Sequence, residues 1–220
     1  MKIAIVGASG KTGIKMVRES LKRGHEVVAV CRFSSADRLN EFADNDGCTV
    51  ISAPVVSDPD TLIQALVGCD AVVAILISVR RLKATDLVRS LANATAANGV
   101  KRLVFTAGEV TAEPENDETF TLRQRIMLAT FSFMTCFTPY SMTDMIKSSV
   151  LVKQQQEWDW TIMRAPTLTE APKTGYRLCE INEITTKHAL SREDYTACML
   201  DSIENPDHYR RTLTAMSANS

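Results

Sequence analysis

Short apolar runs alternate with helical patterns through the first half of the chain, and this alternation strongly narrows the possible folds. The apolar runs, rich in β-forming residues, lie at 2–6, 26–31, 49–52, 71–77 and 101–106. Residues with helical spacing lie between them at 11–23, 36–43, 59–67 and 83–98. Strands that are apolar on both faces and alternate with helices are typical of an α/β fold with a covered parallel sheet. Right-handed crossovers then predict the doubly wound strand order 3-2-1-4-5.

The second half continues the pattern with more helices than strands. Helices are expected at 120–135, 141–157 and 191–203, and strands at 159–164 and 211–216. The last helix begins with Ser191, followed three residues later by Asp194, which is the spacing of a capping box. The last strand is expected at an edge of the sheet. Trp158 and Trp160 should point the same way by strand alternation and act as packing residues.

The composition is that of an ordinary folded domain. The chain has 220 residues, of which 45% are hydrophobic and 23% charged, with a net charge of −1. These values argue against a disordered chain and a general polyanion binder. No apolar run reaches the ~18 residues of a membrane span, and the apolar start is too short for a signal peptide. The six cysteines lack paired spacing and the three histidines are scattered, so we expect reduced thiols, a cytoplasmic location and no metal site.

A glycine-rich loop joins the first strand to the first helix. It reads GASGKTG and comprises Gly7, Ala8, Ser9, Gly10, Lys11, Thr12 and Gly13. A tight turn of this kind brings backbone N–H groups and a helix N-terminus onto a pyrophosphate, because no side chain holds the phosphates away. The alternative is a tight strand-to-helix turn without a ligand. The position of the loop between a buried strand and a helix favours dinucleotide binding.

The end of the second strand indicates which dinucleotide is bound. NAD sites carry an acid there to hold the ribose 2′-OH, whereas this chain has Arg32, Ser34 and Ser35, and no acid before Asp37. An arginine can pair with a 2′-phosphate through two hydrogen bonds, and the serines can add donors. Lys11 can add charge from the glycine loop. The sequence therefore predicts NADP(H) in preference to NAD(H); the alternative is that Arg32 is a solvated surface residue.

Six segments of the chain resemble one known group of proteins. They lie at 3–13, 24–32, 55–73, 100–108, 159–178 and 191–200. The resemblance is to the atypical short-chain dehydrogenase/reductases, and within them to the NmrA-like NAD(P)H-binding family of the flavin reductase and biliverdin reductase B type. It implies a single Rossmann domain over residues 1–220. Residues 1–108 would bind the cofactor, and residues 109–220 would complete the sheet and form a small substrate-binding region.

The same resemblance implies further contacts with the cofactor. Asp58 would lie beside the adenine, although it could equally well cap the helix that begins at Pro59. The other implied contacts come after strands four, five and six, at Ile75, Leu76, Ile77 and Ser78, at Thr106 and Ala107, and at Ala165, Pro166, Thr167 and Leu168. The last of these groups would run beside the nicotinamide.

One catalytic pair that typical members of the group use is missing from the chain. In that pair a tyrosine donates a proton and a lysine four residues later lowers its pKa, but no tyrosine here has a lysine at that spacing. Hydride delivery alone needs no strong protein acid, because proximity and orientation supply much of the rate. We therefore expect an NADPH-dependent oxidoreductase acting on a small aromatic, quinoid or flavin-like acceptor. The candidate orienting or proton-donating residues are Thr106, Tyr140 and Lys147.

Two other functions remain open at this point. The missing pair also fits a non-catalytic NADP(H) sensor, as in the redox-sensing branch of the NmrA-like family, and the same fold carries isomerases and other tailoring enzymes. The expected partner is a small-molecule substrate, since no basic stripe indicates nucleic acid and no segment indicates a membrane. A monomer or a homodimer is expected. Aromatic and methionine residues gather at 120–145, where the resemblance fades, and some of them should line the substrate pocket.

Overall fold

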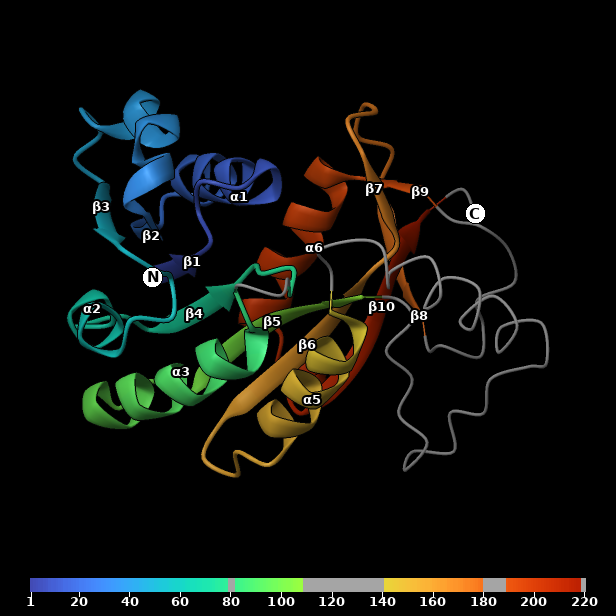
Figure 1. The fold of residues 1–220 in the computed structure, drawn as a ribbon. Helices are drawn as coiled ribbons and strands as arrows, with labels where there is room; N and C mark the ends of the chain where they lie inside the picture. The colour runs from blue at the N-terminus through green and yellow to red at the C-terminus, as the bar shows by residue number, and fades with distance from the viewer. Residues whose placement is uncertain (79–81, 109–140, 180–188, 219–220) are drawn as a thin grey trace.

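A computed structural model of the chain describes residues 1–78, 82–108, 141–179 and 189–218. These residues form one eight-stranded sheet with helices on both faces, together with a separate two-stranded ladder (Figure 1). The α/β fold expected from the alternating pattern is therefore confirmed.

The large sheet runs in the order β3-β2-β1-β4-β5-β6-β10-β8. Its strands are β1 (Lys2–Val6), β2 (Glu26–Arg32), β3 (Cys48–Ala53), β4 (Ala71–Ala74), β5 (Arg102–Gly108), β6 (Asp159–Ala165), β8 (Tyr176–Cys179) and β10 (Arg211–Ser217). All neighbouring strands pair in parallel except β10 and β8. The order predicted for the first five strands is confirmed. The reversal of strand order between β1 and β4 creates the crevice where such sheets bind ligands.

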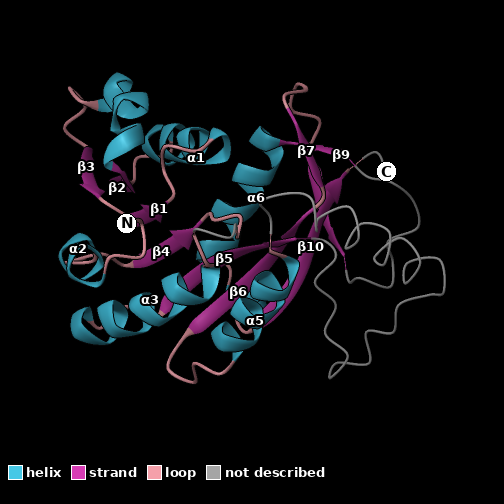
Figure 2. Ribbon diagram, viewed as in Figure 1, coloured by secondary structure: helices cyan, strands magenta, loops and turns pink. Residues whose placement is uncertain are grey.

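Helices cover the two faces of the sheet in separate groups (Figure 2). One face carries α1 (Lys11–Lys22), α6 (Arg192–Glu204) and the 3₁₀ helix η1 (Phe33–Phe42), and the other carries α2 (Pro59–Ala65), α3 (Ala84–Asn98) and α5 (Met142–Lys153). Each group packs on its own apolar core, because the strands alternate their side chains between the two faces. The smaller elements are β7 (Thr167–Thr169), β9 (Ala189–Ser191) and the 3₁₀ helix η4 (Pro206–His208).

Local sequence signals account for several helix ends. Gly99 directly succeeds α3 with a left-handed φ of +68°, a conformation that glycine adopts without strain. The hydroxyl of Ser191 accepts a hydrogen bond from the backbone N–H of Asp194 at 2.9 Å, which confirms the predicted cap of α6. Trp158 and Trp160 are buried in one core, and the indole of Trp158 donates to the Thr95 hydroxyl at 2.9 Å. Their predicted packing role is confirmed.

Two strand predictions were wrong in detail. The last strand, β10, is not an edge strand, because the short segment Tyr176–Cys179 pairs with it on its outer side. The fourth strand ends at Ala74 rather than at 77. Its neighbour β1 ends at Val6 and the chain turns at Gly7, so the bond from the Ile75 N–H to the Val6 carbonyl oxygen at 2.9 Å is the last between the two strands. The helix predicted at 120–135 lies outside the described residues. Within the residues described, no helix has the length and hydrophobicity to cross a membrane.

Candidate functional site

The glycine loop makes a turn that requires glycine at two of its positions, Gly7 and Gly13. Gly7 has a φ of +88°, and a Cβ there would lie 2.1 Å from the carbonyl oxygen of Ile75. A Cβ on Gly13 would lie 2.2 Å from the carbonyl oxygen of Gly7. These contacts are far shorter than van der Waals distances, so the first turn of α1 packs directly against the loop backbone. Close packing of the loop backbone therefore requires glycine at both positions.

The N-terminus of α1 is open to an anion. Gly10 precedes the helix, no side chain caps it, and no acid lies in its first turn. The N–H groups at a helix start carry partial positive charge and favour an anion there. Lys11 is exposed at the first helical position, whereas Thr12 is buried. The loop therefore offers N–H groups and one exposed cation to a phosphate.

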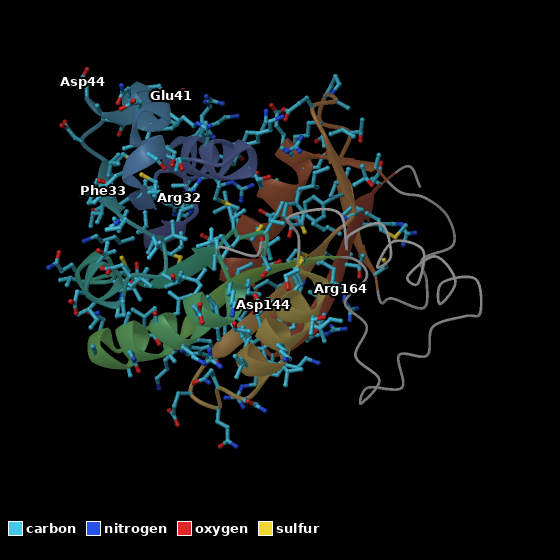
Figure 3. All side chains as sticks on the ribbon, in the orientation of Figure 1. Arg32, Phe33, Glu41, Asp44, Asp144 and Arg164 are labelled. Carbon is cyan, nitrogen blue, oxygen red and sulfur yellow. The ribbon has the colours of Figure 1, made fainter. Side chains whose placement is uncertain are left out.

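The start of η1 lies next to the glycine loop. Arg32 ends β2 with an exposed side chain (Figure 3), and Ser34 is also exposed. Ser35 is buried, and its hydroxyl lies 2.8 Å from the hydroxyl of Ser9 and 3.2 Å from the carbonyl oxygen of Arg32. The two segments that the sequence assigned to the two phosphate groups are thus joined by one hydrogen bond.

Other helix starts in the described part of the chain carry acids. Asp58 caps α2, Asp86 lies in the first turn of α3, and Asp144 lies in the first turn of α5. The start of α6 carries Glu193 and Asp194. Among the helices that the structure describes, only α1 and η1 lack both a side-chain cap and an acid in the first turn. The positive ends of these two helices remain available to a ligand.

Asp58 acts as the cap that the sequence offered as one of its two roles. Its carboxylate accepts hydrogen bonds from the backbone N–H of Thr61 at 2.9 Å and from the Thr61 hydroxyl at 2.6 Å. These bonds, led by the one from the hydroxyl, lower the pKa of Asp58. Its contact with the adenine stays a prediction.

Three large apolar side chains are exposed just beyond consecutive strands. Phe33 comes directly after β2 and is 61% exposed, Val55 lies two residues after β3 and is 41% exposed, and Ile77 lies three residues after β4 and is 59% exposed. Because these strands are parallel, the three residues belong to the same carboxyl edge of the sheet. Exposed apolar groups gathered at one edge are typical of a ligand-binding surface.

The segment 75–78, which follows β4, is hydrogen-bonded to the buried carboxylate of Asp144. In this segment Leu76 and Ser78 are buried and Ile75 is partly buried. Ser78 donates its hydroxyl hydrogen to Asp144 of α5, which also accepts hydrogen bonds from Thr85 of α3. Burial raises the pKa of Asp144, but the hydrogen bonds outweigh burial and the net direction is downward. Asp144 therefore remains ionised at neutral pH.

The end of β5 presents Thr106 toward α6. Thr106 is partly buried, and its hydroxyl lies 3.7 Å from the Met199 sulfur, whereas Ala107 is buried on the opposite face. Nearby, the Tyr195 hydroxyl donates to the carbonyl oxygen of Met163 at 2.9 Å. Burial raises the pKa of Tyr195 well above its usual value. Tyr195 therefore stays protonated, with its hydrogen engaged by the backbone.

The segment after β6 is fixed to both α1 and α6. Ala165 and Leu168 are partly buried, Pro166 is buried and Thr167 is exposed. Glu170 pairs with Lys15 at 3.5 Å and with Arg192 at 2.7 Å. Asp194 accepts hydrogen bonds from the backbone N–H groups of Thr174 at 2.9 Å and Gly175 at 3.0 Å.

The three candidate catalytic residues are not equally placed. Thr106 lies at the carboxyl edge, and Lys147 is exposed on α5. Tyr140 lies outside the described residues. Of these three residues, Thr106 is the one that the described part of the chain places at the strand ends where the cofactor is expected.

Sequence reasoning missed three buried charged residues, Arg102, Asp144 and Arg164. Ser141 and Asp144 have capping-box spacing, but Ser141 makes no capping bond and Asp144 binds the start of α3 instead. Arg164 is fully buried near the end of β6, between Ala107 of β5 and Thr214 of β10 (Figure 3). An arginine inside a buried strand was the available signal for that position.

Comparison with known proteins places this arrangement in a family. The profile of the NAD(P)H-binding family matches residues 7–206. Among curated proteins, the uncharacterized protein YwnB of Bacillus subtilis is 49% identical over 43 residues, which is 20% of each chain. The photosystem II assembly factor Ycf39 of Synechocystis is 30% identical over 115 residues, which is 48% of this chain. The alignments span only 20% and 33% of these two relatives' own lengths.

Solved structures share the fold at low sequence identity. A short-chain dehydrogenase/reductase from Veillonella parvula, in complex with NADP, has a TM-score of 0.79 at 18% identity, covering 99% of this chain and 94% of that chain. ChuY, an anaerobillin reductase from Escherichia coli O157:H7, has a TM-score of 0.77 at 14% identity, covering 100% and 98%. The Rossmann fold and the family resemblance seen in the sequence are thus confirmed, and the chain belongs to the NAD(P)H-binding family.

Proposed function

We propose that the protein is an NADPH-dependent oxidoreductase. The observation that carries this proposal is the pair of acid-free helix starts, α1 and η1, joined by the hydrogen bond between Ser9 and Ser35. NADPH has two separate anionic groups, the pyrophosphate and the 2′-phosphate. Two neighbouring positive helix ends fit two anionic groups better than they fit NADH, which lacks the second.

The glycine loop is the proposed pyrophosphate site. Its closely packed backbone and the first N–H groups of α1 would face the phosphates, with Lys11 adding charge. Arg32 and the serines at the start of η1 would hold the 2′-phosphate, since an arginine can bind such a group through two hydrogen bonds. The solved neighbour from Veillonella parvula binds NADP, which agrees with this choice.

The cofactor, when bound, supplies a hydride. The chain's own contribution is to orient the acceptor and to exclude water, because Tyr195 is engaged by the backbone and no tyrosine–lysine pair stands at the usual spacing. Thr106 offers a hydroxyl at the end of β5 to orient the acceptor, and residues 109–220 would supply most of the substrate site. A planar aromatic, quinoid or flavin-like acceptor fits a site that orients the acceptor and supplies no strong acid. ChuY, which shares the fold, is an anaerobillin reductase.

The test is a binding measurement and then a turnover measurement. We expect the protein to bind NADPH more tightly than NADH, measured by quenching of protein fluorescence, and to oxidise NADPH in the presence of some flavins, quinones or tetrapyrroles. Tight NADPH binding without turnover on any acceptor would instead support a sensor. NADPH-independent conversion of a substrate would support an isomerase on the same fold.

A further inference from the structure

A buried carboxylate joins three segments that are far apart in the sequence. Asp144 lies in the first turn of α5 and is 8% exposed. It binds the hydroxyl of Ser78, the hydroxyl of Thr85 at 2.6 Å and the backbone N–H of Ala84 at 2.7 Å. A buried carboxylate is costly unless its oxygens accept hydrogen bonds, and here Oδ2 accepts three and Oδ1 accepts one. Asp144 therefore connects α5 to the segment after β4 and to the start of α3 through hydrogen bonds.

One part of this arrangement is a helix cap supplied by another helix. Lys83 precedes α3 and makes no side-chain capping bond. The first N–H groups of α3, those of Ala84 and Thr85, point instead to the Asp144 carboxylate at 2.7 and 3.4 Å. The negative charge also lies at the positive end of the α3 dipole. Asp144 thereby fixes α5 to the start of α3.

The other part holds the segment just beyond β4. Ser78 makes three hydrogen bonds: its hydroxyl donates to Asp144 and accepts from the N–H of Ala84 at 3.4 Å, and its carbonyl oxygen accepts from the N–H of Ser141 at 3.0 Å. Ser78 ends the segment 75–78, in which Ile77 is exposed at the carboxyl edge of the sheet. The position of Ile77 relative to α5 is thus set through Ser78.

We propose that Asp144 is a positioning residue for the cofactor site, acting through Ser78 on the segment 75–78. This inference rests on the proposed function, because that segment is expected to line the bound NADPH. With Asp144 in place, the segment is held in one position before the cofactor arrives, so binding orders less of the chain. Without it, the segment must be ordered on binding, and affinity falls.

The chain offers substitutions that separate positioning from stability. Asp144→Asn removes the charge and replaces one acceptor oxygen with a donor. Ser78→Ala removes the side-chain bond between the segment 75–78 and Asp144, while the Ser78 carbonyl keeps its bond to Ser141 and Asp144 keeps its bonds to the N–H groups of α3. Thr85→Ala removes a bond on the α3 side and leaves the link to Ser78 intact. Asp86→Asn is the matched control, because Asp86 is an exposed acid in the same first turn of α3 that pairs only with Arg89 in the described residues.

The experiment measures NADPH affinity, thermal midpoint and amide hydrogen exchange for each variant. We expect Asp144→Asn and Ser78→Ala to weaken NADPH binding about tenfold and to speed exchange at residues 75–78. Thr85→Ala should lower the midpoint with near-normal affinity, and Asp86→Asn should change neither. The double variant of Ser78 and Asp144 should bind no more weakly than Asp144→Asn alone, because the two residues act as one unit.

Two results would overturn the positioning role. One is an equal loss of affinity in Thr85→Ala, which would make the effect a consequence of general destabilisation. The other is unchanged exchange at residues 75–78 in Asp144→Asn. If the unsubstituted protein bound no NADPH, the proposed function would fail, and the exchange measurement would still decide whether Asp144 holds this segment.

Discussion

The hydroxyl oxygens of Ser9 and Ser35 lie 2.8 Å apart, in a buried contact between the glycine loop and the first turn of η1. Ser9 lies beyond the end of β1 and Ser35 beyond the end of β2, and these strands are parallel neighbours, so the bond joins two adjacent strand ends. The Ser35 hydroxyl also donates to the carbonyl oxygen of Arg32. Ser35 therefore connects the backbone of Arg32 to the glycine loop. The proposed sites for the two phosphate groups are therefore held as one unit.

Arg32→Asp should weaken NADPH binding much more than NADH binding. An ionic hydrogen bond is worth roughly 1.5–3 kcal/mol, which corresponds to about ten- to a hundredfold in affinity, and an aspartate would also repel the 2′-phosphate. The measurement is a fluorescence titration with each dinucleotide. Arg38→Asp is a matched control, because Arg38 is an exposed arginine of η1, the helix that directly follows Arg32. Equal losses for NADPH and NADH would remove Arg32 from the 2′-phosphate role.

Gly13→Ala should prevent the glycine loop from closing. The new Cβ would meet the carbonyl oxygens of Gly7 at 2.2 Å and Ala8 at 2.6 Å, and both are backbone atoms that cannot rotate away. We expect a loss of about 3 kcal/mol in unfolding free energy, measured by urea denaturation, together with loss of NADPH binding. Gly24→Ala is the control: Gly24 has a φ of +80° but nothing within 4 Å of a new Cβ. It should cost about 1 kcal/mol and leave binding unchanged; a larger loss for Gly24 would contradict the argument.

The stability of the fold should fall as the pH drops below the usual pKa of histidine. Burial, together with the charges of Arg211 and Arg102, lowers the pKa of His208 in the folded state. Its ring also bonds the Ser202 hydroxyl at 3.0 Å. Protonation is thus easier in the unfolded chain, so the stabilisation is complete above pH ~6.5 and is lost as the pH falls toward the folded pKa.

His208→Gln should reduce this loss. The measurement is the free energy of unfolding in urea at pH 7.5, 6.5 and 5.5. His25 should contribute to the decrease that remains in the variant, because burial lowers its pKa as well. An identical decrease in the variant and the original protein would show that His208 does not contribute.

The first half of the fold was predictable because its signals are local. Apolar strands such as Lys2–Val6 and the glycine loop specify a βαβ unit independently of the rest of the chain. The end of β4 and the strand Tyr176–Cys179 were not predictable, because both depend on hydrogen bonds with distant segments. The role of Asp144 depends on how α5 packs against α3. Its spacing from Ser141 indicates a cap of α5, whereas its carboxylate binds the N–H groups at the start of α3.

The exposed side chain of Phe33 is free to contact a ligand, and we expect that ligand to be the adenine ring. Phe33 comes directly after Arg32 (Figure 3). It lies at the carboxyl edge where Val55 and Ile77 are also exposed. Phe33→Ala should weaken binding of NADPH and of 2′,5′-ADP by about three- to tenfold each, since both contain the adenine and stacking is worth ~0.5–1.5 kcal/mol. The preference for NADPH over NADH should persist, which separates Phe33 from Arg32.

Val67→Ala is the control for Phe33, because Val67 is 58% exposed and lies in the turn that follows α2. It should leave both affinities unchanged. If Phe33→Ala weakened NADPH but not 2′,5′-ADP, the side chain would contact the nicotinamide half instead. If neither affinity changed but the protein changed its oligomeric state in sedimentation, Phe33 would belong to a contact between two chains, because an exposed aromatic next to a polar rim serves such contacts equally well.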